Sequence, residues 1–176
     1  MAKVVVIAGP NGAGKYTVAP AVLRDALLVN EFVNADTIAA GLSAFSPEAV
    51  AVTPGRVMRE RIRKLACAGR DFAFETTLAS RTFAPWLRKH QNEGYRFHLL
   101  YLWLPTAELA AARVAERVRR GGYAIADDIV RRRYERSLIN FLGIYGGFAD
   151  SASGSELGIL ADEASGHAGT YGGSLA

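Results

Sequence analysis

The chain has 176 residues, of which 50% are hydrophobic and 22% are charged, a composition typical of a soluble globular protein. Its single cysteine, Cys67, excludes an internal disulfide and favours a reducing, cytoplasmic setting. No apolar run is long enough to span a bilayer, and Val4–Ala8 is too short for a signal-peptide core, so we expect no membrane segment.

Charge is distributed unevenly along the chain. The net charge is +4, yet every Lys and Arg lies in residues 1–145, while residues 146–176 hold four acids and neither Lys nor Arg. A basic body suits an anionic ligand, either nucleotide phosphates or nucleic acid. An ordinary solvated basic surface would give the same charge, so charge alone does not distinguish a ligand-binding surface from a solvated one.

Strand patterns alternate with helix patterns along most of the chain. Residues 3–9 are β-branched and apolar and end in glycine, which predicts a buried strand. Similar reasoning predicts strands over 31–35, 71–76 and 96–104, and helices over 15–28, 53–68, 81–93, 106–120 and 127–145; Ser46-Pro47-Glu48 marks a further helix start. This alternation predicts an α/β fold with a parallel sheet and helices on both faces.

The two ends of the chain differ in composition. We expect a single domain over residues 1–145. Residues 146–176 form a Gly/Ser-rich acidic tail that we expect to be flexible, with 156–160 as its one short regular piece.

A glycine-rich turn joins the first predicted strand to the first predicted helix. The residues are Gly9, Pro10, Asn11, Gly12, Ala13, Gly14 and Lys15, followed by Tyr16 and Thr17. Glycines let successive backbone N–H groups point into one concavity, and the helix N-terminus favours an anion. The Lys15 ammonium can reach the β- and γ-phosphates of ATP. Because the motif and its context agree, we predict a P-loop NTPase-type nucleotide site.

The residue after the lysine departs from this motif. A Ser or Thr normally supplies a hydroxyl to Mg²⁺ there, but this chain has Tyr16, whose hydroxyl lies at the far end of a ring. Thr17 is the candidate metal ligand, although it lies about 100° further around the helix. The loop therefore predicts ATP binding, and it leaves open how Mg²⁺ is held.

Two acids follow predicted strands at the edge where ligands bind in parallel sheets. Asp36 follows the second strand and is our candidate catalytic base, with a helix cap as the alternative. Glu75 ends the third strand beside Thr77, and we expect both to position the substrate. The alternative for Glu75 is a loop acid without function.

Arginines cluster on the last two predicted helices. Arg113, Arg117 and Arg120 share one helix face, and Arg131, Arg132, Arg133 and Arg136 follow beyond a Gly-Gly pair. This arrangement predicts a helical arginine lid, with at least one of these arginines facing the phosphates. A solvated basic helix pair is the alternative. Nucleic acid is a weaker expectation, because no nucleic-acid module is visible.

These residues together resemble the zeta-toxin family of P-loop kinases. The matching segments are 8–15 with Thr17, 32–36, 72–78, Arg117-Val118 with Gly121-Gly122, and 132–134. The resemblance covers residues 3–145 and stops beyond Asp150, where the family continues into a final strand. We therefore expect the sheet to lack or replace that edge strand. Tyr123 also stands where the family usually has a histidine.

The resemblance implies a kinase that uses ATP and Mg²⁺. It implies a small acceptor, a UDP-N-acetylhexosamine phosphorylated on a sugar hydroxyl, and names an antitoxin protein as a candidate partner. By position, Lys15 corresponds to the phosphate-binding lysine, Asp36 to the base, and Glu75 and Thr77 to the sugar-nucleotide contacts. The lid arginines of the family would be among Arg117, Arg120, Arg132 and Arg133, of which Arg117, Arg120 and Arg133 are our catalytic candidates. The rival hypothesis is a catalytically silent nucleotide-binding module, which Tyr16 and the altered C-terminal segment favour.

Overall fold

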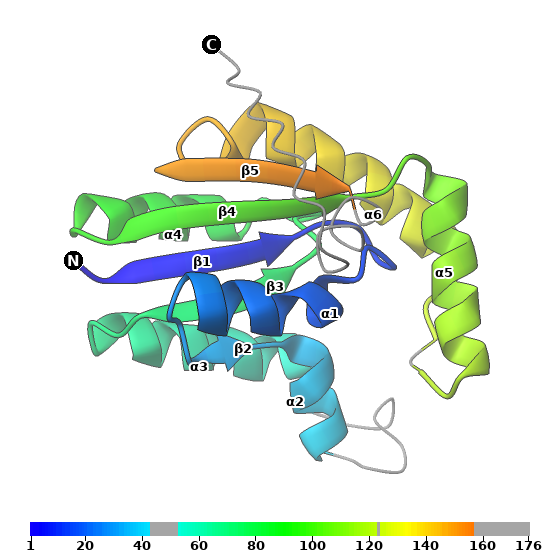
Figure 1. Cartoon of the computed structure of the whole chain (residues 1–176), viewed down its shortest axis with the longest axis horizontal. Helices are drawn as coiled ribbons and strands as arrows, with labels where there is room; N and C mark the ends of the chain where they lie inside the picture. The colour runs from blue at the N-terminus through cyan, green and yellow to red at the C-terminus, as the bar shows by residue number, and fades with distance from the viewer. Residues whose placement is uncertain (43–52, 123, 157–176) are drawn as a thin grey trace.

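A five-stranded parallel sheet forms the centre of the molecule. The computed structural model describes residues 1–42, 53–122 and 124–156. The strands are β1 (Lys3–Ala8), β2 (Phe32–Val33), β3 (Phe72–Thr76), β4 (Arg96–Trp103) and β5 (Ser151–Glu156). Their order is β2-β3-β1-β4-β5 and every pairing is parallel (Figure 1). The predicted α/β class and its parallel sheet are confirmed.

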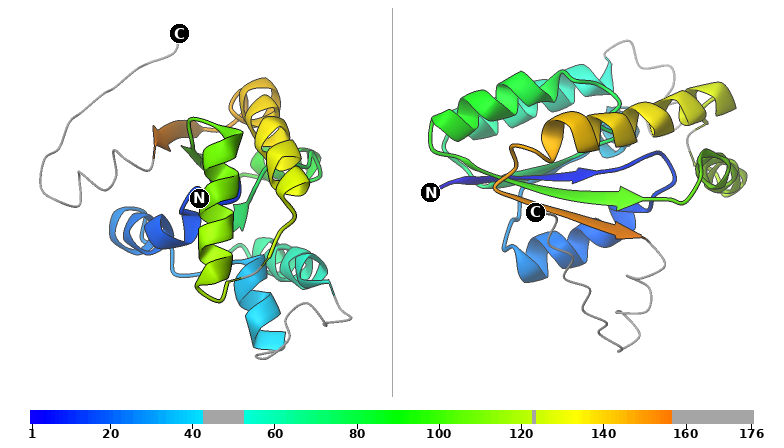
Figure 2. Two further views of the ribbon diagram at one scale, coloured as in Figure 1. Left: turned by 90° about the vertical axis from the view of Figure 1, so that its right-hand side faces the viewer. Right: turned by 90° about the horizontal axis from the view of Figure 1, so that it is seen from above.

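Helices cover both faces of this sheet. They are α1 (Lys15–Pro20) with the π-helical turn η1 (Ala21–Ala26), α2 (Ala35–Leu42), α3 (Pro54–Cys67), α4 (Phe83–Asn92), α5 (Ala107–Arg119), and α6 (Asp127–Asn140) with η3 (Phe141–Tyr145). Figure 2 shows α1 on one face and α3, α4 and α6 on the other, while α5 lies beyond the carboxyl ends of the strands. The carboxyl edge of the sheet is therefore bordered by helices.

Alternation along β1 explains the two layers. Val4, Val6 and Ala8 pack with residues of α3, α4 and η3 in one core, whereas Val5 and Ile7 pack with residues of α1, α5 and α6 in the other. All five side chains are almost wholly buried. A strand buried on both faces reads as a continuous apolar run, which is the pattern from which β1 was predicted.

The predicted helix over 15–28 is confirmed, but it changes from an α-helix to a π-helix after Pro20. Pro20 lies inside it and has no backbone N–H to donate, and the chain winds as a π-helix from Ala21 to Ala26. The helix start predicted at Ser46 lies outside the described residues. No helix in 1–42, 53–122 or 124–156 has the length and apolar character needed to cross a membrane.

The prediction of a flexible tail was wrong for residues 151–156, which form β5. This strand pairs with β4 from His98–Ser151 to Trp103–Glu156, so β4 is not left at the edge. Asp150 sets the register, because its N–H donates to the Phe97 carbonyl and its carboxylate accepts from the Phe97 N–H. The ladder uses backbone groups, so the Ser/Gly-rich side chains gave no strand signal.

Candidate active site

The turn after β1 has the conformation that its glycines predict. Gly9, Gly12 and Gly14 have φ values of 139°, 83° and 76°. A Cβ on Gly9 would lie 2.0 Å from the Leu102 carbonyl oxygen of β4, and one on Gly12 would lie 2.9 Å from the Ala110 carbonyl oxygen of α5. Only glycine allows this turn to lie so close to its neighbours. The turn therefore opens at the central strand, between β3 and β4, where ligands bind in such sheets.

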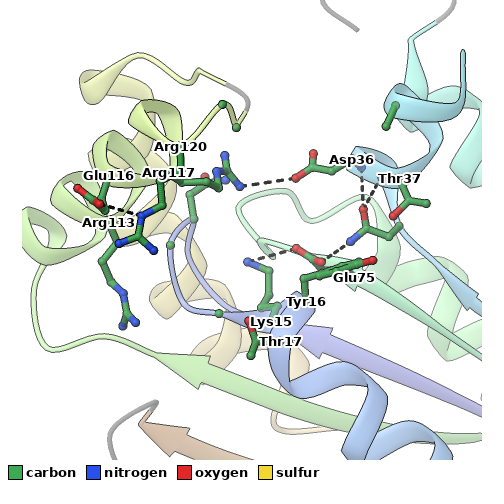
Figure 3. A pocket seen from close by; sticks show the side chains of 17 residues that line it. Lys15, Tyr16, Thr17, Asp36, Thr37, Glu75, Arg113, Glu116, Arg117 and Arg120 are labelled. Carbon is green, nitrogen blue, oxygen red and sulfur yellow. Dashed lines mark hydrogen bonds and ion pairs between the residues drawn. The ribbon is translucent and has the colours of Figure 1, made fainter. Parts of the chain in front are cut away.

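The turn forms one wall of a cavity of about 960 Å³. Lys15 is only 5% exposed, and its Nζ donates to the carbonyl oxygens of Gly9 and Pro10, both at 2.9 Å. The same Nζ lies 3.5 Å from Glu75 Oε1 (Figure 3). The lysine is thus held at the floor of the cavity, beside the backbone that would surround a phosphate.

Asn34, at the end of β2, was not among the predicted site residues. Its Oδ1 accepts from the N–H groups of Asp36 and Thr37 at 2.7 and 3.0 Å, so Asn34 caps α2. Its Nδ2 donates to Glu75 Oε2 at 2.5 Å. The alternative of Asp36 as a helix cap is therefore wrong. The missed signal was an Asn placed two residues before an acid at the end of a strand.

Because Asn34 caps α2, the Asp36 carboxylate is not needed to accept hydrogen bonds from the backbone at the start of this helix. It sits in the first turn of α2, is 70% exposed, and lies 3.7 Å from Arg117 Nη1 of α5. Figure 3 shows Asp36 and Arg117 approaching each other across the cavity above Lys15 and Glu75. An accessible carboxylate at this position can accept a proton from a substrate hydroxyl.

Burial opposes the charges of the Lys15–Glu75 pair. Desolvation lowers the pKa of Lys15, although the neighbouring carboxylate of Glu75 acts in the opposite sense. Desolvation likewise raises the pKa of Glu75, against the attraction of the Lys15 ammonium. Perturbed groups of this kind concentrate at functional sites.

A second cavity of about 720 Å³ lies beside the first and holds the other predicted substrate residue, Thr77. Arginines from two helices line it, Arg59 from α3 and three from α6: Arg132, Arg133 and Arg136. Ser80, Thr76 and Thr77 contribute hydroxyls to its wall. Arg59 was not predicted, because only the fold brings α3 opposite α6.

The predicted arginines divide between the two cavities. Arg113 and Arg117 of α5 and Arg120, the residue that follows this helix, line the first cavity, as their spacing indicates. Arg120 also pairs with Glu116 at 2.9 Å. Arg133 lines the second cavity. Arg131 instead forms ion pairs with Asp127 and Glu108 and lines neither. Closure of these helices as a lid stays a prediction.

The residue after Lys15 is not the Ser or Thr that usually binds the metal in this motif. Tyr16 lines the first cavity and is 65% exposed, but it has no β-hydroxyl to place beside the loop. Thr17 lines the same cavity one residue later. The described residues contain no cluster of three or more His, Cys, Asp or Glu able to hold a metal ion. We therefore derive no catalytic step through Mg²⁺. The cradle of backbone and Lys15 does fit the phosphates of ATP.

Comparison of the sequence with known proteins identifies a family and a relative. A family model described as "AAA domain" matches residues 4–139. An uncharacterised protein of Haemophilus influenzae is 28% identical over 132 residues, which cover 75% of this chain and 92% of that protein.

Two solved structures share the same architecture. One comes from the PezAT chromosomal toxin–antitoxin system of Streptococcus pneumoniae, with a TM-score of 0.63 and 14% identity over 90% of this chain and 69% of that one. The other is shikimate kinase from Acinetobacter baumannii in complex with shikimate, with a TM-score of 0.55 and 20% identity over 94% and 90%. These structures establish a P-loop kinase-like fold without selecting the zeta-toxin branch.

Proposed function

The chain belongs to the AAA domain family, and from this membership and the geometry of the two cavities we propose that it is a phosphotransferase. It would transfer the γ-phosphate of ATP to a hydroxyl of a small acceptor. ATP would occupy the first cavity, with its phosphates on the Gly9–Lys15 turn, and the acceptor would occupy the second.

The observation that carries this proposal is the wall shared by the two cavities. Four residues line both: Asn11, Asn34, Asp36 and Glu75. The cavity that contains the glycine-rich turn thus adjoins the arginine-lined cavity, and the carboxylates of Asp36 and Glu75 lie between them. Phosphoryl transfer needs this juxtaposition, because its catalysis consists mainly of positioning and charge stabilisation.

The residues support an in-line transfer. The acceptor oxygen forms a bond to the γ-phosphorus, the bond to the β–γ bridging oxygen breaks, and ADP leaves. Asp36 takes the proton of the acceptor hydroxyl, since its carboxylate is exposed at the shared wall. Lys15 lies beside Glu75 and Arg117 beside Asp36, so both cations would stabilise the negative charge that accumulates on the transferred group.

The arginines of the second cavity favour an acceptor that carries an anionic group. Among the described residues, Arg59, Arg132, Arg133 and Arg136 line that cavity and form no ion pair there. Guanidinium groups bind phosphate in bidentate geometry. A UDP-N-acetylhexosamine, the acceptor of the family that the sequence resembles, meets this requirement and is the first to test. The likeness to the PezAT structure also supports testing for an antitoxin partner.

A catalytically silent nucleotide-binding module is the second candidate, and Tyr16 is the observation that favours it. The loop can hold phosphates through its backbone and Lys15 without a metal-binding hydroxyl. Tyr16→Ser restores that hydroxyl and leaves the glycines, Asp36 and Glu75 unchanged. Comparison of the natural chain with this variant therefore separates the two candidates.

The test measures transfer of labelled γ-phosphate from Mg-ATP to UDP-N-acetylglucosamine and to a panel of other phosphorylated and neutral hydroxyl compounds. Transfer by the natural chain, lost in Asp36→Asn, is the expected result. Transfer only after Tyr16→Ser would favour the silent module with an intact acceptor cavity. ATP binding without transfer to any acceptor by either protein would overturn the proposal.

A further inference from the structure

The loop 76–80, which begins at the last residue of β3, forms one wall of the second cavity. Four of its residues line that cavity: Thr76, Thr77, Ala79 and Ser80. Leu78 lies between them, is wholly buried, and has a φ of 54°, in the left-handed region that residues other than glycine seldom adopt. Such a conformation persists only where the surrounding contacts impose it. The contacts around Leu78 therefore determine the shape of this wall.

Asn140, the last residue of α6, makes a side-chain contact with Leu78. Its Nδ2 donates to the Leu78 carbonyl oxygen at 2.7 Å, and its Oδ1 accepts from Arg81 Nε at 3.2 Å. A carbonyl oxygen only accepts and an arginine N–H only donates, so the two partners fix the orientation of the amide. Asn140 is 4% exposed, so water has little access to replace the contact with Leu78.

A second residue of the same segment holds the end of the loop. Tyr145, at the end of η3, is wholly buried, and its hydroxyl donates to the Ser80 carbonyl oxygen at 2.9 Å. Within the loop itself, the Leu78 N–H donates to Thr76 Oγ1 at 3.1 Å. The backbone of the loop is therefore attached at two points, Leu78 and Ser80, to the segment formed by α6 and η3.

The helix that anchors the loop also carries the arginines of the facing wall. Arg132, Arg133 and Arg136 line the second cavity from α6, and Arg136 lies about one helical turn before Asn140. One helix thus supplies guanidinium groups to the cavity and, through Asn140, fixes the backbone that carries its hydroxyl groups. The spacing between these two sets of groups depends on the Asn140 contact.

We infer that Asn140 is a positioning residue for the acceptor, because it holds the loop 76–80 against α6 and so sets the spacing between the hydroxyl and guanidinium groups of the second cavity. Asn140 lines neither cavity, so it acts through the loop rather than by touching a ligand. The effect on acceptor affinity rests on the proposed function, whereas the effect on the loop does not. Acceptor affinity should depend on Asn140, and ATP affinity should not.

Three variants separate this role from general stability. Asn140→Ala removes the donor to Leu78 and leaves that carbonyl oxygen buried without it. Ser137→Ala is the matched control, because Ser137 is a wholly buried residue of α6 whose hydrogen bond of 2.8 Å goes to the Tyr101 hydroxyl of β4. Each should melt about 3–8 °C lower, since each loses a buried hydrogen bond. Tyr145→Phe is a milder second variant, which keeps the buried ring and removes the contact with Ser80.

Hydrogen exchange of the full chain, followed by NMR, tests the loop directly. The amides of Leu78 and Ala79 should exchange about tenfold faster or more in Asn140→Ala, and faster to a smaller extent in Tyr145→Phe. Ser137→Ala should leave both rates unchanged, because opening of the loop does not break its hydrogen bond. Unchanged rates in Asn140→Ala and Tyr145→Phe, or an equal acceleration in Ser137→Ala, would overturn the inference.

Kinetics with Mg-ATP and UDP-N-acetylglucosamine, or the compound of the panel that the natural chain phosphorylates, provide a second readout. The KM of the acceptor should rise about tenfold in Asn140→Ala while that of ATP stays within about twofold, and Ser137→Ala should change neither. A parallel rise in both KM values, or the same rise in Ser137→Ala, would reduce Asn140 to a structural role and contradict the inference. Absence of transfer by the natural chain would instead refute the proposed function, and hydrogen exchange would still decide whether Asn140 holds the loop.

Discussion

Lys15→Met should separate nucleotide affinity from fold stability. Methionine has a similar length but removes a cation that donates to two loop carbonyls and lies 3.5 Å from Glu75 Oε1. A hydrogen bond to a charged partner contributes about 1.5–3 kcal/mol. The Kd for an ATP analogue should therefore rise roughly 10- to 100-fold.

The same change leaves the Glu75 carboxylate without its cation. Breaking a fully buried pair costs about 3–5 kcal/mol. Glu75 is 19% exposed and can take up a proton, so we expect a loss of about 1–3 kcal/mol in the free energy of unfolding. Adding Glu75→Gln removes the isolated charge and should recover most of that loss, but it should not recover ATP affinity.

Calorimetry with a non-hydrolysable ATP analogue and urea unfolding of the same samples measure the two quantities. Lys64→Met is the matched control, because Lys64 pairs with Glu60 on the exposed surface of α3, and it should change neither quantity. A Kd within threefold of the natural value would refute the assignment of Lys15. A double variant as unstable as Lys15→Met would refute the role given to Glu75.

Three further predictions concern the loop, the carboxyl group and the second cavity. Gly9→Ala should lower the free energy of unfolding in urea by about 2 kcal/mol or more, whereas Gly41→Ala, whose Cβ meets nothing within 4 Å, should not lower it. The pKa of Glu75 is raised in the fold, so its contribution to the free energy of unfolding is fully present below the ordinary value of 4.5 and is lost as pH rises through the folded value. Glu75→Gln should therefore reduce this loss of stability with rising pH, as measured by thermal unfolding at a series of pH values. Arg136→Ala should raise the KM of an anionic acceptor about tenfold or more without changing that of ATP, while Arg131→Ala, outside both cavities, should change neither.

The sequence predicted the parts of the molecule that depend on local pattern. The run Val4–Ala8 before a glycine-rich turn is sufficient to predict β1 and the phosphate cradle, because the backbone conformation needs glycine at 9, 12 and 14. The three-and-four spacing of Arg113, Arg117 and Arg120 was likewise sufficient to place them on one side of α5, and all three line the first cavity.

The remaining parts depend on contacts between distant segments. Strand β5 has few residues with a preference for strands, and it forms because Asp150 and Phe97 exchange hydrogen bonds that set its register against β4. Arg59 and Arg136 line one cavity only because α3 and α6 cover the same face of the sheet (Figure 2). No spacing in the sequence encodes either relation.

Asn34 also explains how a site with an unusual metal position can remain organised. The carboxylates of Asp36 and Glu75 are placed by a helix cap and an amide hydrogen bond, both from the protein itself. Their positions therefore do not depend on a hydroxyl at position 16. Tyr16 lacks the β-hydroxyl that would hold a metal beside the loop, and it is not one of the residues that line both cavities. Restoration of that single hydroxyl in Tyr16→Ser is for this reason a fair test of the whole site.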